Sequence, residues 1–280
     1  MDLPNIETYQ CPLKIADLNN WNQETAWLAG GTWLFSEPQP HLKVLVDMQA
    51  LGWSEIEVVS FSSPSGSEDY LAIGATCPLI KLLHYPWLPE WTAVDLLKSA
   101  VSALAASLKV INIATVGGNI CLALSVGTLA PAMVALDAIY EIWDLSGKSR
   151  QVAAADFQIG ARKTILQPKE VLRRVLIPLP HLKWKVNYQR FGIAASDPAL
   201  AIVVCASDRQ PNNLSWRCVI GASVAAPRLL KFDGVETQNF ASLLQNIDFI
   251  EDARASSAYR RQITQVLMQR SLSTLSCNNP

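Results

Sequence analysis

The sequence has few of the residues that build metal sites, and they are poorly spaced for that purpose. It contains three histidines, which stand far apart, and six cysteines, no two of which form a C-x-x-C pair. The common zinc and iron–sulfur spacings are therefore absent, so we expect no metal site and no His-based catalytic triad in this chain. We expect the cysteines to be reduced, buried thiols, which is typical of a cytoplasmic protein.

A surplus of charge of one sign is also lacking. The chain has 23 basic and 24 acidic residues, a formal net charge of -1, and no long block of like charge. This argues against nucleic acid or an anionic membrane as the main partner. The N-terminal segment shows no signal-peptide pattern. The most apolar zone, residues 96–143, is interrupted by Gly117-Gly118 and Pro131, so we expect no membrane span.

What the sequence does have is length and apolar content. Its 280 residues are 50% hydrophobic, which favours two or three subdomains. The pattern of strands, helices and turns predicts breaks near residues 55 and 178, and hence segments 1–55, 56–178 and 179–280. The predicted helices are 15–21, 95–108 and 129–138, and the predicted strands are 26–29, 44–48, 57–61, 70–76, 138–145, 169–180, 186–191, 199–207 and 215–223.

The last helix follows Asp252, which we expect to be its N-cap. Helical spacing predicts a common face on this helix. The residues of that face are Tyr259, Ile263, Val266, Leu267 and Arg270.

Two pairs of adjacent glycines interrupt the chain. Gly30-Gly31 follows a predicted strand, and Gly117-Gly118 lies in ATVGGNIC (114–121). A Gly-Gly turn permits positive φ and leaves the backbone bare for a ligand. Successive N–H groups can then form a concave anion site, and two such sites would suit a pyrophosphate. Neither pair follows G-x-G-x-x-G, so a Rossmann site is not expected.

With these glycine loops, the sequence resembles the FAD-binding medium subunit of the xanthine dehydrogenase and carbon monoxide dehydrogenase family of molybdenum hydroxylases. The motifs occur in the family's order and cover nearly the whole chain. The motifs are AWLAGGTWL (26–34), VLVDMQAL (44–51), LAIGATC (71–77), ATVGGNIC (114–121), LAPAMVALDA (129–138), EVLRRVLIP (170–178) and DARASSAYRRQ (252–262).

The resemblance implies an α+β fold. Two α/β subdomains of the PCMH-type would hold FAD, followed by a C-terminal domain with a three-stranded antiparallel sheet and helices. It also implies a cytoplasmic oxidoreductase subunit that passes electrons from a [2Fe–2S] cluster through FAD to NAD or another acceptor. The expected partners are a molybdenum-cofactor large subunit and a [2Fe–2S] small subunit in a hetero-oligomer. No residue of this chain is expected to be catalytic, because a flavin transfers electrons by itself.

The same resemblance supplies the expected cofactor-binding residues. Ala105 could equally be a buried helix alanine, and Leu172 an ordinary strand residue. The full set is Ala29, Gly30, Gly31, Thr32, Trp33, Leu34, Ala105, Thr115, Val116, Gly117, Gly118, Asn119, Thr128, Leu172 and Arg190.

Three departures from the family pattern keep alternatives open. Trp33 stands where a small or acidic residue is usual, and Thr128 replaces an aspartate that would contact the flavin. Arg190 stands in for a lysine, and the arginine that usually follows is missing. One alternative is a structural subunit that has lost FAD. Another is a stand-alone flavoenzyme of the cell-wall-precursor reductase or oxidase type, which shares the two-loop fold.

Overall fold

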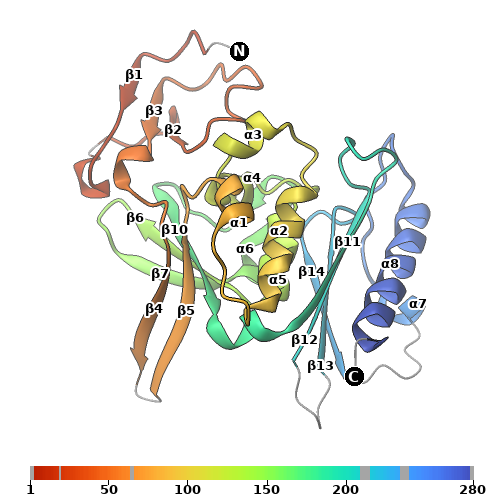
Figure 1. Cartoon of the computed structure of the whole chain (residues 1–280). Helices are drawn as coiled ribbons and strands as arrows, with labels where there is room; N and C mark the ends of the chain where they lie inside the picture. Colours follow the sequence, from red (N-terminus) through yellow and green to blue (C-terminus); the bar gives the residue numbers. More distant parts are fainter. Residues whose placement is uncertain (1–2, 19, 64–65, 209–214, 234–239, 278–280) are drawn as a thin grey trace.

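The computed structural model describes residues 3–18, 20–63, 66–208, 215–233 and 240–277. Three sheets follow one another along the chain (Figure 1), and a two-stranded hairpin lies in the chain between strands β7 and β10 of the second sheet. The expected α+β class is confirmed, since each sheet is accompanied by helices. The three predicted segments each contain one main sheet, but the domain boundaries themselves stay a prediction.

The first sheet is parallel and small. Its strands are arranged in the order β1-β3-β2, so that β3 lies between two strands that precede it in the chain. The carboxyl ends of β2 and β3 therefore lie at the same edge of this sheet. The elements are β1 Thr8–Gln10, the 3-10 helix η1 Ile15–Asp17, β2 Thr25–Leu28, β3 Val44–Asp47 and the 3-10 helix η2 Gln49–Leu51.

The central sheet is antiparallel, with the strand order β4-β5-β10-β6-β7. Strand β10 lies at its centre, and its register against β6 shifts between Leu172 and Arg174. Such a bulge bends a strand and re-aims its side chains. The strands are β4 Ile56–Ser63, β5 Gly66–Gly74, β6 Ile139–Asp144, β7 Ser149–Ala153 and β10 Glu170–Pro178, with the separate hairpin β8 Gln158–Gly160 and β9 Lys163–Thr164.

Helices cover one face of the central sheet. The predicted helix over 95–108 is shorter than expected: α2 ends at Ser102, and α3 begins only at Leu108. Ser107 caps α3, because its hydroxyl accepts a hydrogen bond from the Val110 N–H. The elements are α1 Leu79–His84, the 3-10 helix η3 Thr92–Val94, α2 Asp95–Ser102, α3 Leu108–Ile113, α4 Val116–Leu122, α5 Leu129–Ala135, α6 Ala154–Phe157 and the 3-10 helix η4 Leu179–Lys183.

The C-terminal sheet is antiparallel and has four strands, not the expected three. The additional strand, β14, pairs with β13 at the edge of the sheet. Helix α5 packs on one face of this sheet and α8 on the other (Figure 1). The elements are β11 Lys185–Phe191, β12 Ala201–Ser207, β13 Ser215–Gly221, β14 Arg228–Asp233, α7 Phe240–Leu243 and α8 Ser257–Cys277.

The largest core joins the second and third segments. It includes residues of the central sheet, the helices on it and one face of the C-terminal sheet, such as Ile202, Val204 and Val219. The opposite face of that sheet forms a second core with Leu267, Met268 and other residues of α8. Burying both faces explains why β12 is buried along its whole length.

The face predicted for the last helix is confirmed at Leu267 and Ile263, which pack in the second core, and wrong at Tyr259 and Val266. Tyr259 is 45% exposed and Val266 37% exposed, whereas Arg260 is fully buried against the sheet. The helix begins at Ser257, so Asp252 is not its N-cap. Asp252 instead accepts hydrogen bonds from the N–H groups of Arg254 and Ala255 in the preceding turn.

The expectation of reduced cysteines is also wrong for one pair. Cys205 and Cys218 lie directly opposite each other on β12 and β13 and are joined by a disulfide. The thiols of Cys11, Cys77 and Cys121 are free.

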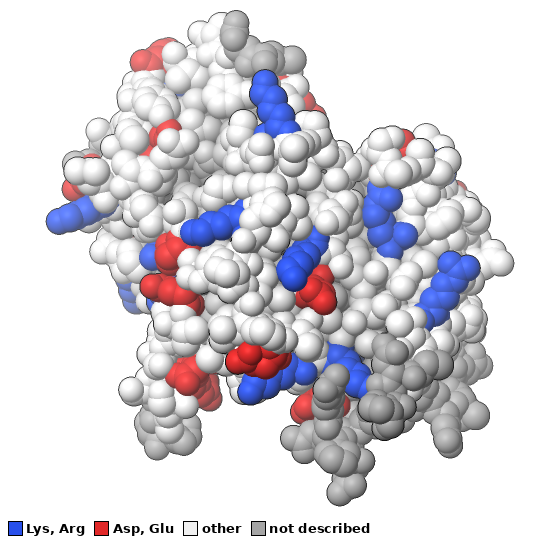
Figure 2. Space-filling model, viewed as in Figure 1, with Lys and Arg blue, Asp and Glu red and all other residues white. Residues whose placement is uncertain are grey.

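Charged side chains are scattered over the face in view, and neither sign forms a continuous patch among the coloured residues (Figure 2). Within the described part of the chain, no helix is long and apolar enough to cross a bilayer.

Candidate functional site

The two glycine loops meet at one cavity of about 430 Å³, although they are far apart in the sequence. The first loop follows the carboxyl end of β2, and the second leads from α3 into α4. Segments from the end of β3 and the start of β10 complete the walls. The described residues that line the cavity are Trp27, Leu28, Ala29, Gly30, Gly31, Thr32, Trp33, Leu34, Met48, Ala75, Leu104, Ala106, Val110, Ala114, Thr115, Gly117, Gly118, Asn119, Cys121, Leu122, Leu124, Leu166, Glu170, Val171 and Leu172.

The first loop offers unused hydrogen-bond donors. Gly31 has φ +66°, and its carbonyl accepts the N–H of Phe35 at 2.9 Å, which closes a single helical turn. The N–H groups of residues 30–34 have no acceptor within the described part of the chain. Since residues 30–34 all line the cavity, the first loop is a ready site for an anionic group.

The second loop uses its backbone donors inside the protein. The N–H of Val116 bonds to the Cys77 oxygen at 2.9 Å, and that of Gly117 to the Ala75 oxygen at 2.8 Å. The N–H of Gly118 bonds to the hydroxyl of Thr115, which caps α4, at 3.0 Å. The expectation of two equivalent anion sites is therefore wrong, because these donors are already paired.

Close packing accounts for a glycine in each loop. A Cβ on Gly30 would lie 2.2 Å from the backbone oxygen of Ile113, and one on Gly117 would lie 2.7 Å from the Cβ of Ala75. Real Cβ atoms do not approach other atoms so closely. These glycines bring the loops together, in addition to leaving the cavity surface bare.

Two buried polar atoms without partners belong to residues of the cavity wall. Asn119 Oδ1 and Trp27 Nε1 are buried, and neither has a hydrogen-bond partner in the described structure. Both residues line the cavity. Buried polar atoms are normally paired, so an acceptor and a donor left open at one cavity fit a bound ligand that supplies the missing partners.

The ionisable groups of the cavity wall carry little net charge. The Arg150 guanidinium holds both oxygens of Glu170 at 2.7 Å and keeps the pKa of that carboxyl below its usual value. Burial raises the pKa of the Cys121 thiol to about 12, although a hydrogen bond from the Leu172 backbone opposes this. A neutral thiol and a paired carboxylate make a poor acid–base couple, so the cavity suits binding better than proton transfer.

Eleven of the fifteen expected cofactor-binding residues line the cavity, and four do not. Ala105 is exposed between α2 and α3, and Val116 is buried as the first residue of α4. Thr128 is buried before α5, and its carbonyl accepts the Tyr188 hydroxyl at 3.1 Å. Arg190 donates to the Asp197 carbonyl beside β11. None of these four residues lines the cavity, and the buried Thr128 hydroxyl and Arg190 Nε have no hydrogen-bond partner in the described structure.

Many residues of the cavity wall were not predicted from the sequence. Two of them carry the most chemistry: Trp27, with its unpaired Nε1, and Glu170, with its ion pair. Trp27 sits one residue before the LAGGT stretch, and Glu170 opens the EVLRRVLIP motif, so both positions lay within quoted motifs. The other missed residues are mainly apolar.

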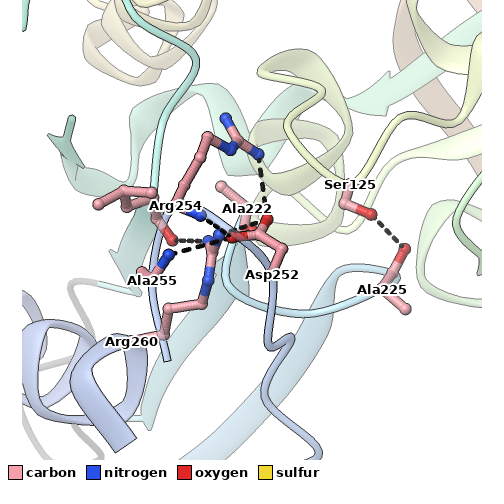
Figure 3. Close-up of polar contacts among 8 residues, drawn as sticks. Ser125, Ala222, Ala225, Asp252, Arg254, Ala255 and Arg260 are labelled. Atoms are coloured by element: carbon pink, nitrogen blue, oxygen red, sulfur yellow. Dashed lines mark hydrogen bonds and ion pairs between the residues drawn. The ribbon is translucent and has the colours of Figure 1, made fainter. Parts of the chain in front are cut away.

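The C-terminal segment contacts the loop that follows α4. The Ala222 N–H bonds to the Ser125 oxygen at 3.0 Å, and the Ser125 hydroxyl reaches the Ala225 oxygen (Figure 3). Arg260 donates to the oxygens of Ala222 and Leu200 and forms an ion pair with Asp252 at 2.8 Å. Arg260 thus holds the turn at Ala222, which contacts Ser125 in the loop that follows α4.

Residues 5–180 match the family described as the FAD-binding domain in molybdopterin dehydrogenases. Over 67 residues, the chain is 43% identical to a xanthine dehydrogenase of Oryza sativa subsp. japonica and 37% identical to xanthine dehydrogenase 1 of Arabidopsis thaliana. Each match covers 24% of this chain and only 5% of the plant protein.

Solved structures resemble the whole chain. Quinoline 2-oxidoreductase from Pseudomonas putida 86 superposes with a TM-score of 0.79 at 22% identity, covering 98% of both chains. Carbon monoxide dehydrogenase from Hydrogenophaga pseudoflava gives a TM-score of 0.81 at 20% identity, covering 99% of both. The enzyme from Oligotropha carboxidovorans gives 0.81 at 21% identity, covering 100% of both. At these identities the likeness establishes the fold.

Proposed function

The chain belongs to the family of FAD-binding domains in molybdopterin dehydrogenases, and from this premise we propose that it is the FAD-binding electron-transfer subunit of a molybdenum hydroxylase. One observation carries the proposal. Two glycine loops more than eighty residues apart line a single cavity, which combines open backbone donors with apolar walls. That pairing suits a dinucleotide with an anionic centre and flat, mostly apolar rings.

Different residues of the cavity would bind different parts of FAD. The open N–H groups of residues 30–34 would bind phosphate oxygens. Asn119 Oδ1 and Trp27 Nε1, which have no hydrogen-bond partner in the described structure, would form hydrogen bonds with FAD. Leu172 and the other apolar residues would exclude water from the rings. When bound, FAD would supply the redox chemistry, and these side chains would supply position and environment.

The proposed route brings electrons from a [2Fe–2S] subunit through FAD to NAD or another acceptor. Substrate would be oxidised at a molybdenum cofactor on a large partner subunit, in a hetero-oligomer located in the cytoplasm. Two observations support this arrangement. Matching structures include carbon monoxide dehydrogenases, one of which is described as lacking the Mo-pyranopterin moiety of its cofactor. No group of three or more metal-binding side chains occurs within the described residues of this chain.

The first experiment is the visible absorption spectrum of the purified chain, with release and quantification of bound flavin. We expect close to one FAD per chain. A colourless protein that also refuses added FAD would contradict the proposal and favour the structural subunit without FAD. Turnover of a substrate by the isolated chain would instead favour the stand-alone flavoenzyme.

A second experiment addresses the partners. A tagged chain expressed in its own host is purified gently, and the co-purifying chains are analysed for molybdenum and iron. We expect both metals on separate chains, together with substrate-dependent reduction of an added acceptor such as NAD. Isolation of the tagged chain alone, without either metal, would argue against the proposed complex.

A further inference from the structure

An arginine lies over the tryptophan of the first loop. The guanidinium carbon of Arg162 is 4.5 Å from the centre of the Trp33 ring, within the range of a cation–π contact. The same guanidinium forms an ion pair with Glu37 at 3.5 Å. We propose that Arg162 is a positioning residue for FAD, which acts by holding Trp33 in place at the cavity wall. This inference rests on the proposed function.

The position of Arg162 is fixed by its backbone. It lies in the turn between β8 and β9 with φ +57°, and its N–H donates to the Ala123 oxygen at 2.8 Å. The buried amide of Gln158 donates to the same oxygen at 2.9 Å and to the Ala225 oxygen at 3.2 Å. These hydrogen bonds join the hairpin to the loop that follows α4 and to the C-terminal segment. The backbone from which the Arg162 side chain extends is therefore fixed.

The ring of Trp33 separates the guanidinium from the cavity. Trp33 lines the cavity and Arg162 does not, although Arg162 contacts a face of the ring. Trp33 is also held by its backbone, because its carbonyl accepts the N–H and the hydroxyl of Ser36 at 2.9 and 2.7 Å. With both the backbone and the ring restrained, Trp33 has little freedom to enter and fill the cavity.

The charge of Arg162 also matters, because the cavity wall contains no basic residue. Neither lysine nor arginine occurs among the described lining residues, whereas the pyrophosphate of FAD is anionic. Trp33 lies within the same run of open N–H groups that would bind the phosphates. Because this guanidinium is paired with Glu37 and half exposed, it favours an anion at the loop weakly and acts mainly by keeping Trp33 and the loop donors in a single arrangement.

The test is the FAD dissociation constant and release rate of single and double variants. Arg162→Ala should weaken binding about twofold to thirtyfold, as a cation–π contact would, mainly by faster release. Arg162→Lys should recover much of this loss, because it keeps a cation. In the Trp33→Ala background, the same Arg162→Ala change should have little further effect.

The matched control is Lys163→Ala, which removes a positive charge from the next residue of the same hairpin and leaves the contact of Arg162 with Trp33 in place. It should leave the dissociation constant near that of wild type. Wild-type affinity in Arg162→Ala would overturn the inference, and so would an equal loss in the Trp33→Ala background. A wild-type chain that binds no FAD would overturn the proposed function itself.

Discussion

Gly30 and Ile113 are in contact at a distance that only glycine permits. A Cβ at residue 30 would lie 2.2 Å from the Ile113 oxygen and 3.1 Å from the Ala114 Cα. This contact joins the first glycine loop to the end of α3, from which the chain enters the second loop. The cavity is therefore shaped by the packing of one loop on the other, before any ligand is considered.

The first prediction concerns this contact. Gly30→Ala should destabilise the protein by about 2–4 kcal/mol, because the clash is with backbone that cannot rotate away. Gly160→Ala is the control, since its nearest atoms would be 3.7 Å away, and it should change the free energy of unfolding by less than about 0.5 kcal/mol. Urea unfolding measures both. Equal stability of the two variants would show that the loops are not held by this packing.

The second prediction concerns the cap of α4. Thr115 is buried, and its hydroxyl accepts the Gly118 N–H at 3.0 Å. Thr115→Val should cost about 1–2 kcal/mol, because it removes the capping acceptor while keeping the shape of the side chain. Thr115→Ser retains the hydroxyl and should keep most of the stability. A urea midpoint for Thr115→Val equal to that of wild type would contradict the capping role.

The meeting of the two glycine loops could be anticipated from the sequence, whereas most of the cavity wall could not. The loops carry compact local signals, Gly30-Gly31 and Gly117-Gly118. The wall residues Trp27, Cys121 and Glu170 come from a strand, a helix and another strand. Their side chains share a cavity because of how these elements pack, and local spacing carries no information on that packing.

Two further differences between the predicted and the observed elements have physical causes. Helix α8 buries the polar residues Arg260, Thr264 and Ser271 on the same face as the hydrophobic residues of its second half, so polar side chains interrupt the hydrophobic periodicity of its inner face. Strand β14 is a short edge strand that contains Lys231, which is typical of protected edges but weak as a strand signal. In both cases, tertiary packing outweighs the local pattern.

The third prediction separates binding from folding at Asn119. Its Oδ1 is buried without a partner, which is costly unless a ligand supplies one. Asn119→Leu should therefore leave the stability of the FAD-free chain unchanged or slightly raised, while weakening FAD binding about fivefold to tenfold.

The control for Asn119 is Asn112→Ala, at an exposed position of α3. Neither its stability nor its FAD affinity should change appreciably. Thermal unfolding with and without FAD, together with a flavin titration, gives both quantities. Destabilisation of the FAD-free chain by Asn119→Leu would mean that this amide serves the fold and is not reserved for a ligand.

The fourth prediction concerns pH and the pair of Asp252 with Arg260. Burial by itself would raise the pKa of Asp252, but hydrogen bonds from Arg260 and from the Arg254 and Ala255 N–H groups lower it to about 2. A carboxyl whose pKa is lower in the folded protein than in the unfolded chain stabilises the fold at pH values above the unfolded pKa. That contribution disappears as the pH falls from about 5 towards 2. Since the Asp252 side chain is one-third exposed, this contribution to the free energy of unfolding amounts to about 1–2 kcal/mol.

Asp252→Asn should lower the stability at pH 7 by about 2–3 kcal/mol, because fully buried Arg260 then lacks its anion. Between pH 5 and pH 2, the stability of the variant should also fall less than that of wild type. Asp95→Asn is the control, since Asp95 pairs with Lys98 on the surface, and its stability should follow wild type at every pH. Unfolding midpoints measured across this range test the pair. If the Asp252→Asn curve runs parallel to that of wild type, another carboxyl carries the acid sensitivity, and the contribution of Asp252 does not depend on its ionisation between pH 5 and pH 2.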